Sequence, residues 1–174
     1  MRRNLFVLVA GVALAGAVSY MAPASGQFEG EDAPIFEGKI PPGYRDWRLI
    51  SVAHEAGSLN DLRAILGNDV AIEAYRKGKL PFPDGTIIAR LAWSYVPSEE
   101  NDKVFGHPQS FVAGPPKEGV QFMVKDSSKY ASTNGWGFAQ FIDGKFVDQA
   151  TLKGCSPCHE PAKANDFVFT RYAP

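Results

Sequence analysis

The chain of 174 residues is long enough for one domain of ordinary size, and it has the composition of a globular protein, with 45% hydrophobic and 21% charged residues. Its 18 basic and 19 acidic residues give a net charge of −1, without the basic stripe of nucleic-acid-binding proteins, so we expect no nucleic-acid partner. The absence of an internal repeat, a low-complexity tract or a second domain boundary predicts a single domain.

The first 26 residues have the pattern of a secretory signal peptide. Arg2 and Arg3 form a basic start, an apolar run covers residues 5–18, and small residues lead to a cleavage site near Gly26. The alternative is an uncleaved membrane anchor, because the apolar run could continue through Met21 toward the roughly 20 residues of a spanning helix. Either way we expect the globular part to be periplasmic or otherwise exported, with no membrane contact unless the signal remains uncleaved.

Residues 27–43 are rich in Gly, Pro and acidic residues, and we interpret them as an extended lead-in to a domain at 44–174. In this domain, alternating polar and apolar residues, β-branched residues and turns of the Pro-Asp-Gly and Asp-Gly type predict strands. The predicted strand segments are 44–54, 62–66, 86–93, 120–126 and 136–146. Alternation places Arg63 and Ile65 on one face of their strand.

Short helices are predicted between and after these strands. In residues 68–79, Asn68 can cap the start of a helix by accepting a backbone N–H bond, and Gly78 can supply the left-handed residue that ends it. Residues 146–155 are typical of a short helix, whereas the charged stretch 98–102 is expected to be a solvated loop. These elements predict an α+β fold, mainly an antiparallel β-sheet with a few short helices.

Both cysteines lie near the end of the chain in the sequence "CSPCH", residues 155–159. A structural zinc site needs four ligands, and only His54 and His107, both expected at the surface, remain to complete one. A redox dithiol of the thioredoxin type would lie early in a βαβ pattern, which this chain lacks. A disulfide between such near neighbours would restrict the unfolded chain little, and it would leave His159 without a role.

Haem attachment accounts for all three residues of the motif. Cys155 and Cys158 have the spacing at which two thiols form thioethers with the two vinyl groups of one porphyrin. His159 then follows directly as the proximal ligand of the iron. Export agrees with this interpretation, because thiols outside the cytoplasm seldom stay reduced without a use. We therefore predict one covalent haem c per chain, bound by the two cysteines and with His159 as its metal ligand.

Several sequence blocks follow one another between Tyr44 and the end of the chain: "YRDW", "FPDGTIIARLAW", "VQFMVKDSSKYA", "GWGFAQF", "CSPCH" and "DFVFTRY". In these blocks the chain resembles the cytochrome P-460 family, together with the related cytochromes c′-beta. The resemblance implies a mostly β-sheet subunit that forms a homodimer, with a five-coordinate haem held by the motif histidine. It also implies one of two activities, since P-460 members oxidise hydroxylamine while c′-beta members bind nitric oxide and carbon monoxide.

The resemblance further implies which residues lie on the open side of the haem. A lysine that is cross-linked to the porphyrin in P-460 enzymes corresponds to Arg90, a proton-handling glutamate to Gln121, and a distal arginine to Arg63. From the residues alone, Arg90 interrupts an apolar strand and needs a carboxylate partner or a wet pocket. A place on the wet face of the sheet remains the alternative for Arg90, and a surface amide the alternative for Gln121.

Three functions stay open at this stage. The first is a haem protein that binds or handles nitric oxide or a similar small ligand at an open iron site. The second is an oxidoreductase acting on hydroxylamine or another small nitrogen compound, so whether the chain is an enzyme stays open. The third is an electron-transfer cytochrome in which Met123, otherwise a core residue, is the sixth ligand. The expected partners are a small diatomic or nitrogen-oxide ligand, a redox partner protein and a second copy of the chain.

Overall fold

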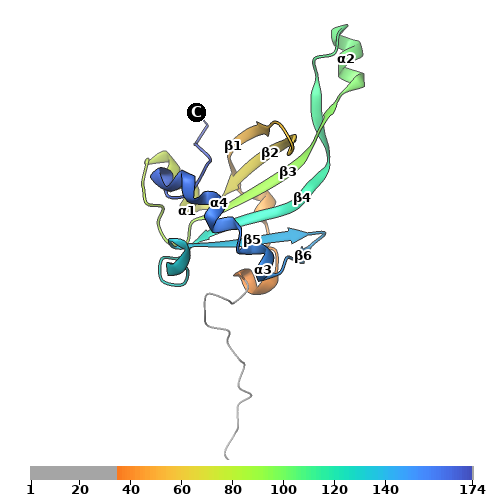
Figure 1. Cartoon of the computed structure of the whole chain (residues 1–174). Coiled ribbons are helices and arrows are strands. Elements are labelled where there is room, and N and C mark those ends of the chain that lie inside the picture. The colour runs from red at the N-terminus through yellow and green to blue at the C-terminus, as the bar shows by residue number, and fades with distance from the viewer. Residues whose placement is uncertain (1–34, 174) are drawn as a thin grey trace, which may run out of the picture.

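The computed structural model describes residues 35–173, and its centre is one six-stranded antiparallel sheet (Figure 1). The strands β1 to β6 lie side by side in chain order, so sequence neighbours are also neighbours in space. Their bounds are Arg48–Glu55, Asp61–Gly67, Ile87–Pro97, Phe111–Lys125, Trp136–Ile142 and Lys145–Phe146. The predicted α+β fold with a mainly antiparallel sheet is confirmed, while the predicted signal peptide at 1–26 lies outside the described residues.

Short helices connect and follow the strands. The α-helices α1 to α4 cover Asp69–Arg76, Glu99–Phe105, Gln149–Leu152 and Cys155–His159, and the 3-10 turns η1 to η4 cover Ile35–Gly38, Tyr44–Asp46, Ala131–Thr133 and Glu160–Asn165. Helix α1 has the predicted ends, since the Asn68 side chain accepts a bond from the Ala71 N–H and Gly78 follows the helix with φ 59°. Within residues 35–173 there is no helix with the length and apolar character needed to cross a membrane.

The segment that we expected to be a loop at 98–102 is instead the start of α2. The side chain of Ser98 accepts a hydrogen bond from the Asn101 N–H, which satisfies one of the free donors at the helix start. The acidic residues of the first turn also suit the positive end of the helix dipole. Helix α2 therefore forms from the same charged residues that suggested a loop, and it lies at the tip of an arm made by the outer parts of β3 and β4 (Figure 1).

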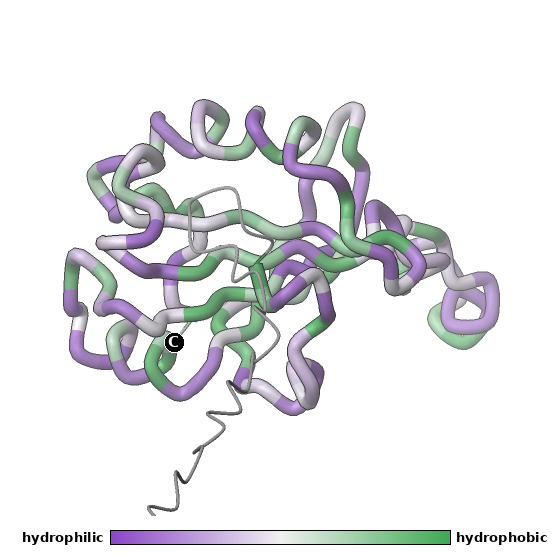
Figure 2. The backbone as a smooth tube through the Cα atoms, turned by 90° about the horizontal axis from the view of Figure 1, so that it is seen from below, coloured by the Kyte–Doolittle hydropathy of each residue, from purple (hydrophilic) through white to green (hydrophobic). Residues whose placement is uncertain are grey.

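Side chains of the sheet alternate between two apolar layers. On β3, Ile88 packs in the first layer while Ala89 and Leu91 pack in the second; on β4, Met123 packs in the first and Phe122 in the second. Residues of α1 and of the C-terminal segment complete the first layer, and η1 completes the second. Figure 2 shows hydrophobic and hydrophilic residues interleaved along the chain of the sheet. This two-sided burial explains the nearly continuous apolar run in the centre of β3, which is interrupted at Arg90.

Strand β1 contains an irregularity that interrupts the alternation expected for its residues. Leu49 and Ser51 pair with successive residues of β2, so Ile50 between them is an extra residue. Ile50 is 1% exposed in the first apolar layer, whereas Leu49 is 52% exposed. Beyond the irregularity, every second residue of β1 faces the cavity described below, namely Ser51, Ala53 and Glu55.

Gly119 in β4 lies directly against the backbone of β5. Its φ is +64°, and a Cβ placed there would lie 1.9 Å from the backbone oxygen of Phe141 in β5. We expect Gly119→Ala to lower the free energy of unfolding by more than about 1 kcal/mol, since both the backbone angle and the contact oppose a side chain. Gly144→Ala is the matched control in denaturant unfolding, with φ +77° and nothing within 4 Å of the added carbon. Equal losses in the two variants would contradict the role of the close approach.

Candidate functional site

A cavity of about 640 Å³ lies between the sheet and the C-terminal part of the chain. Strands β1 to β5 form one wall, while α3, α4 and residues 168–171 form the other. The volume is within the range of sites that enclose a small molecule or a cofactor. The charged, amide, thiol and imidazole side chains that line it are Glu55, Arg63, Arg90, Glu118, Gln121, Gln140, Cys155, Cys158, His159 and Arg171. The structure thus brings every site residue predicted from the sequence to the same cavity.

Helix α4 carries the motif residues on the C-terminal wall. Cys155 and Cys158 are three positions apart and His159 is four positions after Cys155, so the helix presents all three on neighbouring parts of its surface. Both cysteines are free thiols. Burial, and to a smaller extent the neighbouring Cys158, raise the pKa of the Cys155 thiol above its ordinary value. Cys155 is therefore held as a neutral thiol near neutral pH.

The imidazole of His159 is oriented by a backbone carbonyl. Its Nδ1 lies 2.7 Å from the carbonyl oxygen of Phe167, and because a carbonyl oxygen only accepts, Nδ1 carries the proton. Burial lowers the pKa of His159, and the bond to Phe167 offsets part of this shift. The neutral ring therefore keeps its lone pair on Nε2. The rings of Phe138 and Phe169 flank it, with centroids 5.2 and 5.0 Å away.

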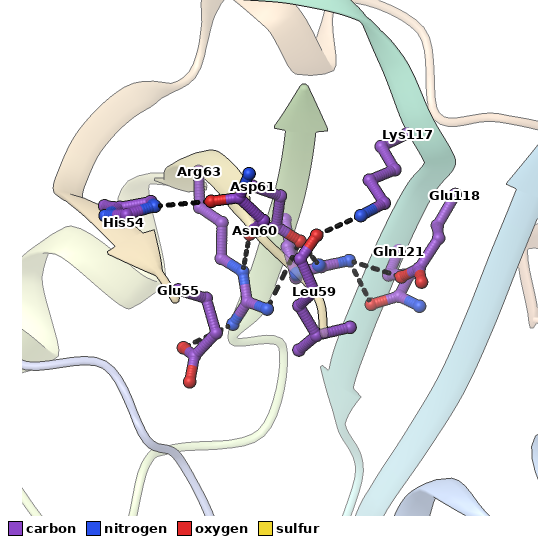
Figure 3. Close-up of polar contacts among 10 residues, drawn as sticks. His54, Glu55, Leu59, Asn60, Asp61, Arg63, Lys117, Glu118 and Gln121 are labelled. Carbon is purple, nitrogen blue, oxygen red and sulfur yellow. Dashed lines mark hydrogen bonds and ion pairs between the residues drawn. The ribbon is translucent and has the colours of Figure 1, made fainter. Parts of the chain in front are cut away.

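A buried carboxylate joins two arginines on the opposite wall (Figure 3). Asp61, at the start of β2, is 0% exposed. Its oxygens accept from Arg63 Nε at 2.6 Å and from Arg90 Nη2 at 2.8 Å. Both guanidinium side chains are only 17% exposed. Asp61 therefore holds two cations together inside the cavity wall, which meets the requirement for a carboxylate partner that the sequence raised for Arg90.

The remaining polar groups of this wall complete the network. Arg63 Nη1 donates to Glu55 Oε2 at 3.0 Å, while Arg90 Nη1 donates to Gln121 Oε1 at 3.0 Å and lies 3.4 Å from Glu118 Oε2. Figure 3 shows these groups converging from β1, β2 and β4. The bond to Arg90 occupies the amide oxygen of Gln121, so its amide N–H groups are the end left to donate to a ligand.

The comparison with known families tests the expectation that this chain is a haem protein. A family model described as cytochrome P-460 matches residues 41–170, which include both walls of the cavity. The chain belongs to the cytochrome P-460 family. It is therefore a haem c cytochrome of the P-460 type. No curated protein matches this chain.

The residues of the cavity fit the haem that membership of the cytochrome P-460 family implies. His159 offers a neutral Nε2 lone pair, which suits an iron ligand. The thiols of Cys155 and Cys158 are free on the same wall. Aliphatic and aromatic side chains suited to the faces of a porphyrin also line the cavity, namely Ile65, Ile88, Met123, Phe138, Val168 and Phe169.

Of the other residues singled out in the sequence, Met123 lines the cavity, whereas His54 and His107 do not. Met123 lines the cavity and is also part of the first apolar layer, with 9% exposure. His54 is exposed, stacks on Tyr95 with centroids 4.1 Å apart, and contacts Asn60. His107 is exposed beyond α2. Neither of these histidines lines the cavity of this cytochrome P-460 family member.

Sequence reasoning missed Asp61, although it joins the two arginines. Asp61 lies two residues before Arg63 in a strand, so alternation alone places them on one face. That signal was available in the sequence. The contact with Arg90 depends on the register of β2 against β3, in which Asp61 pairs with Ser94 and Ile65 with Arg90. No local pattern in the sequence specifies that register.

Proposed function

We propose that this protein is an exported mono-haem c cytochrome that binds nitric oxide and similar small ligands at an open iron site. The observation that carries the proposal is the contrast between the two cavity walls. His159 on one wall offers a neutral imidazole nitrogen, whereas the facing wall offers guanidinium and amide donors. Ligand binding needs this arrangement, because the protein supplies one strong ligand and hydrogen-bond donors near the open position.

Cys155 and Cys158 would hold the haem by adding their S–H groups across its two vinyl groups. Each addition forms one C–S bond and moves the thiol hydrogen to the other vinyl carbon, so no atoms are lost. When bound, the haem supplies an iron with a free coordination position and a one-electron couple. In the proposed holoprotein Cys155 and Cys158 would fix the position of the haem, and His159 would ligate its iron and orient it.

Arg63, Arg90 and Gln121 would stabilise a bound diatomic that carries partial negative charge. Each direct hydrogen bond is worth on the order of 1 kcal/mol, or somewhat more where a guanidinium donates. Asp61 holds the two guanidiniums in place, so their donors need little reorganisation when the ligand arrives. The preorganised cation pair therefore favours ligands that accept charge from the iron.

The presence of two carboxylates in the cavity favours the second candidate, an oxidoreductase acting on hydroxylamine or another small nitrogen compound. Such oxidation releases protons, and Gln121 cannot accept them near pH 7. The carboxylates of Glu55 and Glu118 also line the cavity, each beside one of the arginines. They are the available proton acceptors, so this function would rely on them rather than on residue 121.

The proposed macromolecular partners are a redox protein and a second copy of this chain. The arm made by β3, α2 and β4 carries several exposed apolar side chains, which support a protein contact there. They are Val104, Phe105, Phe111 and Val112, with exposures of 81%, 52%, 46% and 40%. In Figure 1 the tip of this arm at α2 lies away from α4, which lines the cavity, so such a contact would leave the ligand site open.

The substitution Gln121→Glu tests the proposed ligand site. Replacing a donor amide by a carboxylate is expected to raise the dissociation rate of nitric oxide from the ferrous protein on the order of fivefold, the equivalent of about 1 kcal/mol. Stopped-flow spectroscopy measures this rate. Gln109→Glu makes the same change of charge on the exposed loop after α2 and is the control, with no change expected. Equal rates in the two variants would contradict the placement of Gln121 against the ligand.

Optical and resonance Raman spectra, taken before and after nitric oxide is added, separate the three functions. The proposal requires five-coordinate high-spin ferric iron, or iron with only water opposite His159. A low-spin spectrum that becomes high-spin in Met123→Leu would favour the electron carrier instead. Faster hydroxylamine turnover in Gln121→Glu, with loss of turnover in Glu118→Gln, would favour the oxidoreductase.

A further inference from the structure

The chain after the haem motif contains two consecutive residues in the left-handed backbone region. Asp166 has φ 49° and Phe167 has φ 64°, and neither is glycine. Aspartate tolerates this region moderately well, but for a phenylalanine it is a rare conformation. Such backbone persists only where surrounding contacts hold it. Backbone bonds from the Asp166 N–H to the Lys163 carbonyl and from the Phe167 N–H to the Ala162 carbonyl, both 3.0 Å, hold the turn locally, and the side chain of Asp166 supplies a further anchor elsewhere in the fold.

That anchor is a buried ion pair with the end of β4. Asp166 Oδ1 accepts from Lys125 Nζ at 2.9 Å, and Asp166 Oδ2 accepts from the Phe82 N–H at 2.8 Å. The side chains of Lys125 and Asp166 are 5% and 8% exposed. Lys125 Nζ also donates to the Asn134 carbonyl at 3.1 Å and lies 4.9 Å from the centroid of the Trp136 ring. Both charges are thus well partnered, which a buried pair requires.

The anchor is itself part of the rigid sheet. The backbone N–H of Lys125 donates to the Thr86 carbonyl at 2.9 Å, and its carbonyl accepts from Gly85 at 2.9 Å. The turn that it holds is directly joined to the group that orients the motif histidine, because the carbonyl of Phe167 accepts from His159 Nδ1 at 2.7 Å. A continuous chain of contacts therefore runs from β4 through Asp166 and Phe167 to His159.

We propose that Lys125 and Asp166 are positioning residues for His159, because their ion pair holds the turn whose carbonyl sets the strength of the bond between His159 and the haem iron. This inference rests on the proposed ligation of the iron by His159. A histidine ligand is oriented, and its basicity raised, by the partner of its other ring nitrogen. Loosening the turn weakens the bond from Nδ1 to the carbonyl, so the imidazole becomes a poorer donor to iron.

If the ion pair of Lys125 and Asp166 only stabilised the fold, removing both charges should leave the bond between His159 and the iron unchanged. Replacing a buried ion pair by neutral residues often leaves stability nearly unchanged, so a neutral double variant can keep the fold while it releases the turn. Lys125→Met with Asp166→Asn is suitable, because asparagine tolerates left-handed backbone and its side-chain oxygen can still accept from Phe82. Lys77→Met with Glu73→Gln is the matched control, since it removes the exposed ion pair between Glu73 of α1 and Lys77, the residue that follows this helix, outside the cavity.

The experiment measures the iron–histidine stretching band of the ferrous holoprotein by resonance Raman spectroscopy, and its midpoint potential. In the Lys125/Asp166 variant we expect a lower stretching frequency and a higher potential, because a weaker donor stabilises ferric iron less. The ratio of ferric to ferrous protein at a fixed potential should fall on the order of tenfold, equivalent to about 59 mV for one electron. Neither value should change in the Lys77/Glu73 control.

The outcomes separate this inference from the proposed function. If His159→Gly abolishes the band while the Lys125/Asp166 variant matches the wild type in both readouts, His159 is the ligand and the positioning role is wrong. If His159→Gly leaves the band unchanged, the proposed ligation itself fails. Should the first variant not yield holoprotein, Lys125→Met with Asp166→Gly relieves the strained backbone at residue 166. Wild-type values in that variant overturn the positioning role equally.

Discussion

Replacing both Cys155 and Cys158 by alanine is expected to make the haem fully extractable by acidified organic solvent, whereas the wild-type protein should retain it. The two thioethers are the only covalent links that we propose, so their loss leaves the haem held by His159 and by packing alone. Intact mass spectrometry of the wild type should give the polypeptide plus one complete haem, because adding S–H across a vinyl group loses no atoms. No loss of hydrogen through a cross-link is expected either, since Arg90, which the resemblance matches to the cross-linking lysine, is a guanidinium that stays protonated.

The controls for this prediction come from the same helix. Cys155→Ala and Cys158→Ala singly should each keep one thioether, so the haem should still resist extraction. Ser156→Ala, between the cysteines, should behave as the wild type. Haem that resists extraction in the double variant would contradict the proposal that Cys155 and Cys158 attach it. A proteolytic haem peptide that also contains an Arg90 fragment, or a lysine from a separate fragment of the chain, would show a cross-link and favour the oxidoreductase.

The substitution Asp61→Asn is expected to lower the free energy of unfolding by about 3–5 kcal/mol, the usual cost of removing one partner from a buried ion pair. Asparagine keeps the size of Asp61 but removes the charge that balances Arg63 and Arg90 inside the cavity wall. The two guanidiniums should then repel one another and turn toward solvent. Denaturant unfolding measures the loss, and faster nitric oxide dissociation should accompany it.

The exposed pair of Arg48 and Asp69 supplies the control for Asp61. Asp69 is 90% exposed, and its pairing with Arg48 is that of an ordinary surface ion pair, which contributes about 0–1 kcal/mol. Asp69→Asn should therefore have a much smaller effect than Asp61→Asn. Adding Arg90→Gln to Asp61→Asn should recover part of the lost stability, since one unpaired buried cation is removed. Equal stability of Asp61→Asn and the wild type would show that the cluster is not needed to balance charge.

The residues that sequence reasoning located correctly share a local signature. The alternation of Ile88, Ala89 and Arg90 follows from the period of two in a strand, and it puts Arg90 on the same face as Ile88, which lines the cavity. The ends of α1 followed from Asn68 and Gly78, whose chemistry acts within a few residues. The same reasoning failed at α2, because a run of charged residues suits both a solvated loop and the first turn of an exposed helix.

Contacts between segments that lie far apart in the sequence could not be predicted from such local patterns. Asp61 contacts Arg90 only because β2 and β3 pair in one register, and a shift by one residue would turn these side chains to opposite faces. The extra residue in β1 likewise depends on how β1 pairs with β2. The pattern within one strand is equally compatible with several registers, so it leaves the partner across the sheet open.

The amino-acid sequence by itself determined the Cys-x-x-Cys-His motif for which we propose haem attachment, the predominance of strands, and which polar residues interrupt apolar segments. These features depend on spacing along the chain and on the preferences of single residues. The tertiary structure decided that Asp61 joins two arginines, and that Lys125, 41 positions before Asp166, supports the turn beside His159. The physical reason is that buried charges are stable only beside partners, and the fold selects those partners when strands pair and the C-terminal segment packs on the sheet.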